Sequence, residues 1–90
     1  KALADDTIAH FDCGAATYGL VLAAWSKGIG SVINGQGIMQ SSVVRENAMI
    51  PDDQVIMTCV AMGYPDDSFV ANDVKSRRTP NDKVASFIGF

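Results

Sequence analysis

Apolar residues recur at helical spacing through residues 8–25 of the chain. Steps of four and three residues give one apolar stripe, made of Phe11, Ala15, Tyr18, Leu22 and Trp25. A second stripe of smaller residues is made of Ala9, Cys13, Ala16, Leu20 and Ala23. Gly14 and Gly19 lie between the stripes, and each costs a helix about 1 kcal/mol relative to Ala. Since the helix is apolar on more than one face, we expect it to be buried, with close packing offsetting the glycines.

Residues with known capping preferences mark the two ends of this helix. Asp5 or Asp6 can accept hydrogen bonds from the first free backbone N–H groups. Lys27 lies in the last turn, where its charge suits the helix dipole. Gly28 can take the left-handed conformation that ends a helix. The sequence therefore predicts a helix that runs from the aspartate cap to about Lys27.

The next segment alternates short regular runs with turns. Residues 29–34 are predicted to form a short strand that leads into a glycine-rich turn at residues 34–37. Ser41 or Ser42 can then cap a short helix over residues 43–48. The order predicted so far is helix, strand, turn and helix.

A continuous apolar run with β-branched residues, residues 55–61, follows a turn at residues 51–53. Such a run is typical of a strand buried on both faces. Residues 68–80 are polar and predicted to be irregular, whereas residues 83–90 are apolar enough that we expect them to dock on this subunit or another. Two strands do not make a stable sheet alone. We therefore expect other strands, from a partner chain or from sequence outside this chain, to complete the sheet.

Composition and charge narrow the classes of partner. Hydrophobic residues make up 48% of the 90 residues, which leaves apolar surface for a partner in so short a chain. The formal net charge is −3, which argues against broad binding to nucleic acid or to anionic membranes. No apolar run approaches the roughly 20 residues of a membrane span. We therefore expect a single partial domain that associates with protein rather than with nucleic acid or membrane.

Cysteine usage and the N-terminal residues favour a cytoplasmic protein. Cys13 and Cys59 each lie in an apolar segment, so we interpret both as buried, reduced thiols, with a disulfide as the alternative. His10 has no neighbours that suggest catalysis or metal binding, and we interpret it as a surface or interface residue. Residues 1–6 show no hydrophobic region ahead of a cleavage site, so no signal peptide is expected.

A cluster of cations lies in the tail of this acidic chain. Lys75, Arg77 and Arg78 supply three of its seven basic residues within four positions. The cluster is too small for a nucleic-acid surface and well sized for one phosphate group. The alternative is a solvated surface cluster paired with Asp66, Asp67 and Asp73.

Four segments occur in the order found in the second half of the nitroreductase family. They are residues 28–35 (GIGSVING) after the long helix, residues 43–46 (VVRE) followed by 50–53 (IPDD), the apolar run that ends at 63–65 (GYP), and the tail at 75–80 (KSRRTP). No segment is specific alone, but together their order and spacing resemble the family over nearly the whole chain.

The resemblance implies an α+β fold that binds FMN at a homodimer interface. It also implies hydride transfer from NADH or NADPH, through the flavin, to nitroaromatic or quinone-type acceptors. The chain would then be the C-terminal half of a nitroreductase-like domain. Residues 1–28 would form the dimer helix, residues 29–63 a strand–helix–strand unit, and residues 64–90 a tail that reaches the partner subunit.

The resemblance also assigns site residues. Ile33, Asn34 and Gly35 match the family loop beside the flavin ring, where a glycine lets a backbone N–H approach the ring closely. Arg78 matches the family's phosphate-binding arginine, and Lys75 matches a nearby lysine if one residue of slack is allowed; Arg77 is the competing assignment. No catalytic side chain is implied, since the flavin carries the chemistry.

The same resemblance implies an FMN site that is incomplete within this chain. The family carries an arginine- and serine-rich FMN motif in its first half, which this chain lacks, and Ile33 stands where the family often has proline. A second hypothesis is therefore a truncated, inactive relic that self-associates as a structural or binding module. A third is a binder of small anions through the same cations. For residues 34–37 the alternative is an ordinary turn, and for Tyr18 and Trp25 packing is preferred to stacking on a cofactor.

Overall fold

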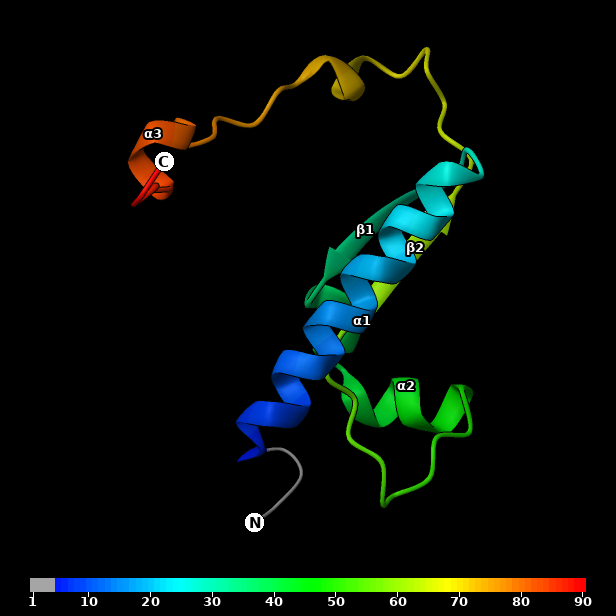
Figure 1. Ribbon diagram of the computed structural model, residues 1–90. Helices are drawn as coiled ribbons and strands as arrows, with labels where there is room; N and C mark the ends of the chain where they lie inside the picture. The colour runs from blue at the N-terminus through cyan, green and yellow to red at the C-terminus, as the bar shows by residue number, and fades with distance from the viewer. Residues whose placement is uncertain (1–4) are drawn as a thin grey trace.

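The computed structural model describes residues 5–90 of the chain, so the signal-peptide prediction falls largely on residues 1–4, outside the described part. The described part is α+β (Figure 1). Helix α1 spans Thr7–Ser26. Asp6 caps it, because its Oδ1 accepts hydrogen bonds from the N–H of Ile8 at 3.0 Å and of Ala9 at 3.2 Å. The predicted start of the helix is therefore confirmed.

The C-terminal end of α1 is closed by backbone hydrogen bonds around Gly28. The Gly28 N–H donates to the Trp25 carbonyl at 2.9 Å, and the Ile29 N–H donates to the Ala24 carbonyl at 3.0 Å. Gly28 has a φ of +76°, the left-handed conformation that this pattern of bonds requires. The predicted stop is confirmed, and it turns the chain directly into the first strand.

The sheet has two antiparallel strands, β1 (Gly30–Asn34) and β2 (Cys59–Gly63). The strand predicted at residues 29–34 is confirmed. The strand predicted at residues 55–61 is wrong at its start, because β1 ends opposite Cys59 and residues 55–58 have no strand to pair with.

The burial predicted on both faces of β2 is not found in the single chain. Cys59 and Val60 are half-buried, and the rest of β2 is exposed. Each strand also has one open edge, since the sheet has only these two strands within residues 5–90. The prediction that further strands complete the sheet stays open.

Between the strands the chain passes through a 3₁₀ turn, η2 (Gln36–Ile38), and helix α2 (Ser41–Asn47). The predicted helix is confirmed, but its predicted serine cap is wrong. Ser41 and Ser42 lie inside the helix, and Gln40 takes the cap position without a side-chain hydrogen bond. Gln40 has a φ of −104° and a ψ of 60°, so the helical backbone begins at Ser41, before either serine can take the cap position.

The turn predicted at residues 51–53 is confirmed, and Arg45 of α2 holds it. The Arg45 Nη1 donates to the Pro51 carbonyl at 2.6 Å and to the Gln54 carbonyl at 2.9 Å. The Gln54 N–H also donates to the Pro51 carbonyl at 3.1 Å. The long connection between the strands is therefore tied together at its tip.

The tail leaves the sheet after β2 and curves away as an arm (Figure 1). It contains one 3₁₀ turn, η3 (Val70–Asp73), and one short helix, α3 (Asn81–Val84). The irregular structure predicted for residues 68–80 is thus interrupted by η3. At the end of the arm the rings of Phe87 and Phe90 pack edge to face with centroids 6.1 Å apart, and both are exposed. The expected docking of this apolar end stays a prediction.

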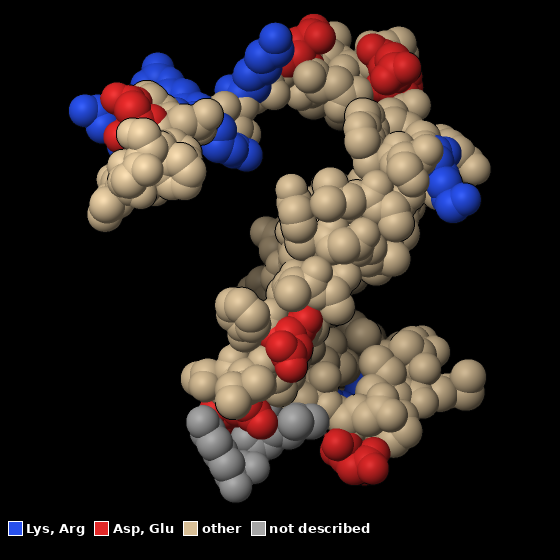
Figure 2. Space-filling model, in the orientation of Figure 1, with Lys and Arg blue, Asp and Glu red and all other residues tan. Residues whose placement is uncertain are grey.

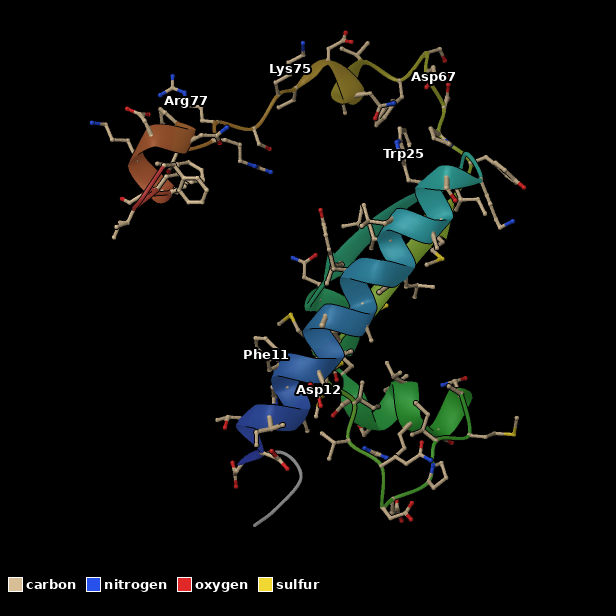
Figure 3. All side chains as sticks on the ribbon, in the orientation of Figure 1. Phe11, Asp12, Trp25, Asp67, Lys75 and Arg77 are labelled. Atoms are coloured by element: carbon tan, nitrogen blue, oxygen red, sulfur yellow. The ribbon has the colours of Figure 1, made fainter. Side chains whose placement is uncertain are left out.

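Small side chains of α1 pack on the sheet, while its large ones point outward. The face toward the sheet is made of the half-buried Ala9, Cys13, Thr17 and Val21 and the buried Ala24. Phe11 is 78% exposed and Trp25 is 66% exposed, and Figure 3 shows both projecting from the ribbon of α1. The expected burial of the helix is therefore not reached within one chain.

The chain exposes more surface than a compact domain of its size. Its accessible surface is 7998 Å², whereas a compact monomer of its mass exposes about 5,000 Å². Its radius of gyration is 17.2 Å, against about 12 Å for a compact domain of this length. Among residues 5–90, Ala24 is the one buried hydrophobic residue, and it is still 7% exposed. None of the helices in this described part is long and apolar enough to cross a membrane.

Candidate functional site

The predicted flavin-side loop begins at the last rung of the sheet. Ile33 pairs with Val60, and Asn34 pairs with Cys59. Gly35 then turns the chain into η2 with a φ of −90° and a ψ of −20°, a conformation open to any residue. The Ile38 N–H donates to the Gly35 carbonyl at 3.2 Å. The turn predicted at residues 34–37 is confirmed, and a rigid sheet end positions it.

Asn34 holds this loop through both its side chain and its backbone. The Gly37 N–H donates to the Asn34 Oδ1 at 2.8 Å. The Thr58 Oγ1 donates to the Asn34 carbonyl at 3.5 Å. The contribution of Gly37 and Thr58 was not predicted from the sequence. The signal for Gly37 was present, because an Asn side chain commonly accepts from a backbone N–H two or three residues further on.

Gly35 is the open point of the loop. Within residues 5–90 its N–H donates to no other group, and a Cβ added there would have no atom within 4 Å. A flat ligand can therefore approach the backbone here without steric hindrance from this chain.

Ile33 also lines a cavity of about 230 Å³ between α1 and the sheet. The cavity is lined by His10, Cys13, Gly14, Thr17, Ile33, Met57 and Thr58.

Cys13 and Cys59 are free thiols, in agreement with the reduced state predicted, although both are half-buried rather than fully buried.

His10 is an exposed residue on α1, as predicted. Its Nδ1 lies 2.7 Å from the Asp6 carbonyl oxygen, which also accepts from the His10 backbone N–H. A carbonyl oxygen can only accept, so we assign the proton of this hydrogen bond to Nδ1. His10 therefore helps to close the first turn of the helix.

The cationic cluster lies on the extended arm of the tail. Figure 2 shows Lys and Arg side chains along this arm, with acidic side chains among them and further cations on the body of the molecule. Residues 74–80 have no helix or strand, and Val74 is extended with a φ of −72° and a ψ of 118°. Lys75 and Arg77 point the same way in Figure 3.

Arg78 differs from these two residues. Its Nη1 donates to the Arg77 carbonyl at 3.1 Å, so its guanidinium folds back on the backbone of the arm. The assignment of Lys75 and Arg78 to one phosphate stays a prediction. Arg77 was the competing assignment from the sequence.

The alternative, in which carboxylates of the arm neutralise the cluster, finds no support at Asp66. Hydrogen bonds from the Ser68 hydroxyl at 2.6 Å and from the Ser68 N–H at 3.0 Å hold the pKa of Asp66 below its ordinary value of 3.8. No cation contributes to this lowering of the pKa. Asp66 therefore shapes a local turn with Ser68.

The structure does not bring the loop and the cationic cluster together. The arm that carries Lys75 and Arg77 is separated from β1 and η2 in Figure 3. The predicted residues thus form two half-sites in one chain: the loop half-site (Ile33, Asn34 and Gly35) and the cation half-site (Lys75, Arg77 and Arg78).

Comparison with known proteins identifies relatives of this chain. A family model described as the Nitroreductase family matches residues 1–64, which include the loop half-site. A chloronitrobenzene nitroreductase of Comamonas testosteroni is 27% identical over 81 residues, which are 89% of this chain and 36% of the relative. Because this alignment covers 89% of the chain, it includes the cation half-site whatever residue the alignment starts at. No solved structure matches the chain.

Proposed function

Because the chain belongs to the nitroreductase family, we propose that it forms the C-terminal part of an FMN-dependent oxidoreductase. The enzyme would transfer hydride from NADH or NADPH to nitroaromatic or quinone-type acceptors. Within the chain, residues 1–28 would supply the dimer helix, residues 29–63 the loop half-site, and residues 64–90 the arm. Nitroreduction is the family's chemistry, and the chloronitrobenzene reductase among the relatives suggests the class of acceptor.

The open backbone at Gly35 is the observation that carries this proposal. Its N–H has no partner within residues 5–90, and no atom of this chain approaches the position of a Cβ. A bound flavin would accept and pass on the electrons, and the protein would supply orientation and hydrogen bonds to the ring. Gly35 is suited to donate such a bond, and Ile33 offers an apolar side chain next to it.

The cation half-site is suited to the phosphate of FMN. Arginine can bind a phosphate with two parallel N–H donors, and lysine adds a point charge. Lys75 and Arg77 lie on one side of the arm, so both can face one phosphate. We therefore place Arg77 ahead of Arg78 in this role.

A partner is needed to complete the site. The two half-sites do not meet within one chain. The excess exposed surface is about 3,000 Å², well above the ~800 Å² per partner of a standard interface. The nitroreductase family, whose model matches residues 1–64, is generally homodimeric, and this membership supports a second copy as the partner. We propose that a second copy, or the family's first half, covers α1 and joins the loop to a cation half-site.

Flavin uptake tests the proposal. The purified chain is titrated with FMN, and the visible spectrum, flavin fluorescence and sedimentation are recorded. We expect a bound yellow chromophore that bleaches when NADH or NADPH is added without oxygen. Absence of FMN binding at tens of micromolar would refute a flavin site in this chain. The inactive self-associating relic predicts this last result together with a stable oligomer.

Charge reversal separates the two arginines. Arg77→Glu should weaken FMN binding more than Arg78→Glu, because the Arg78 guanidinium is turned toward the Arg77 carbonyl. Lys83→Glu is the matched control, since it makes the same charge change in α3. A larger effect of Arg78→Glu would return the phosphate role to Arg78. Equal effects of all three variants would indicate attraction by net charge alone.

A further inference from the structure

The backbone of the loop half-site is fixed by contacts on both sides of Asn34. Asn34 pairs with Cys59 at the last rung of the sheet, and this pairing sets where the loop starts. Its Oδ1 accepts from the Gly37 N–H at 2.8 Å, which sets where the loop goes next. Gly35 lies between these two anchors. The position of the Gly35 N–H therefore depends on the Asn34 side chain.

Gly37, the second anchor of the loop, has almost no free space around its Cα. A Cβ built on Gly37 would lie 2.8 Å from both the Cβ and the Sγ of Cys59. The Cys59 Cβ belongs to the sheet and cannot move without its strand, so only glycine lets the loop approach this closely. The Asn34 Oδ1 would lie 3.0 Å from the same added Cβ. The loop is thus packed directly against the first residue of β2.

We propose that Asn34 is a positioning residue of this loop. It orients the Gly35 N–H for the cofactor by binding Gly37, and it does not contact the cofactor through its own amide. The family resemblance places Asn34 beside the flavin but does not say how it acts. The effect of Asn34 on cofactor binding rests on the proposed FMN function. The positioning of the loop by Asn34 is a property of the chain without cofactor.

Two substitutions distinguish positioning from direct contact. Asn34→Ala removes the acceptor for Gly37, whereas Asn34→Asp keeps the acceptor and removes the amide NH₂. We expect Asn34→Ala to weaken FMN binding about two- to tenfold, the factor that one neutral hydrogen bond contributes. We expect Asn34→Asp to restore most of that loss and the position of the flavin absorption band. Asn47→Ala is the matched control, because Asn47 donates to the Val43 carbonyl in α2, outside the loop.

The opposite pattern would overturn the proposal. If Asn34→Asp binds FMN as weakly as Asn34→Ala, the amide NH₂ acts directly on the cofactor. If Asn34→Ala binds FMN like the unmodified chain, Asn34 does not position the loop for it.

A measurement without flavin separates this proposal from the proposed function. Hydrogen exchange of the Gly37 amide is followed in the cofactor-free chain. Asn34→Ala should speed this exchange about two- to tenfold, and Asn34→Asp should not. If the exchange responds in this way and the unmodified chain binds no FMN, the loop positioning holds and the flavin function fails. If the Gly37 exchange is unchanged in Asn34→Ala, the positioning role is refuted whatever the flavin result.

Discussion

Association of the chain should depend on the outer stripe of α1, and Leu22→Glu tests this directly. Leu22 is 53% exposed and lies on the stripe that faces away from the sheet. Fully burying a leucine contributes about 1.5–3 kcal/mol, and association can bury only the exposed half of Leu22. Its loss should therefore weaken association by about 0.8–1.6 kcal/mol, or about 4- to 15-fold, for each copy in the interface. A charge placed in an apolar interface adds to this cost.

The expected affinity follows from the surface that the chain leaves exposed. The excess of about 3,000 Å² is on the scale of obligate interfaces, which cover about 1,000–2,500 Å² per partner. Such partners commonly fold only when they associate, so the helical signal should fall on dilution. The single tryptophan, Trp25, reports on the same event, since it is 66% exposed in one chain and should become shielded in the complex.

Sedimentation velocity, circular dichroism and Trp25 emission are measured over a dilution series. Leu22→Glu should shift all three transitions to higher concentration. Gln40→Glu is the matched control, because it adds the same charge at an exposed position outside α1. A monomer that unfolds cooperatively at a concentration-independent midpoint, with Trp25 solvated, would refute the reasoning. So would equal shifts from Leu22→Glu and Gln40→Glu.

Three further predictions concern the loop, the arm and the turn. Gly37→Ala should lower the free energy of unfolding by about 1–3 kcal/mol at fixed protein concentration, because its Cβ would meet that of Cys59. Gly35→Ala meets no atom within 4 Å, so it should change the free energy of unfolding by less than about 0.5 kcal/mol, while its Cβ should hinder the approach of FMN. Equal destabilisation by Gly35→Ala and Gly37→Ala would contradict the packing of Gly37 against Cys59. Ser68→Ala should raise the pKa of Asp66 toward 3.8 in an NMR titration, with Ser86→Ala as the control. Since the folded pKa is lowered, the turn at Ser68 is stabilised above pH 3.8 and loses this support as the pH falls through the folded value. An unmoved midpoint would exclude the Ser68 hydroxyl bond as a cause, since the Ser68 N–H bond remains in the variant. Arg45→Ala should speed proteolysis between residues 51 and 54, because it removes two hydrogen bonds to that turn; Arg45→Lys should do so less, and no change would show that the turn holds without them.

Local signals carried most of what the sequence predicted correctly. The start of α1 depends on Asp6 and its end on Gly28, and both act within one turn of the helix. The failures occur where the answer depends on distant residues. The apolar run at residues 55–61 does not reveal that β1 ends opposite Cys59, so its first residues were assigned to a strand that has no partner there.

The candidate site shows the same division between local signals, which the sequence reveals, and distant contacts, which it does not. The glycine-rich turn identified the loop, but the need for glycine at position 37 depends on Cys59, which is 22 residues further along the chain. The cationic cluster was recognised from the close spacing of Lys75, Arg77 and Arg78 in the sequence. Which arginine accompanies Lys75 stays a prediction, because residue type does not distinguish Arg77 from Arg78. The separation of the two half-sites has no signal in the sequence.

The long connection between the strands leaves and rejoins the sheet at one rung. Asn34 and Cys59 are register partners, so residues 35–58 form a closed excursion whose length does not alter the pairing of β1 with β2. Doubling the length of such a loop costs only about 0.6 kcal/mol. The tip between Asp52 and Asp53 is exposed, and hydrogen bonds from Arg45 and from the Gln54 N–H hold it. It is therefore the place to insert a peptide tag or a fluorophore while leaving the strands in register.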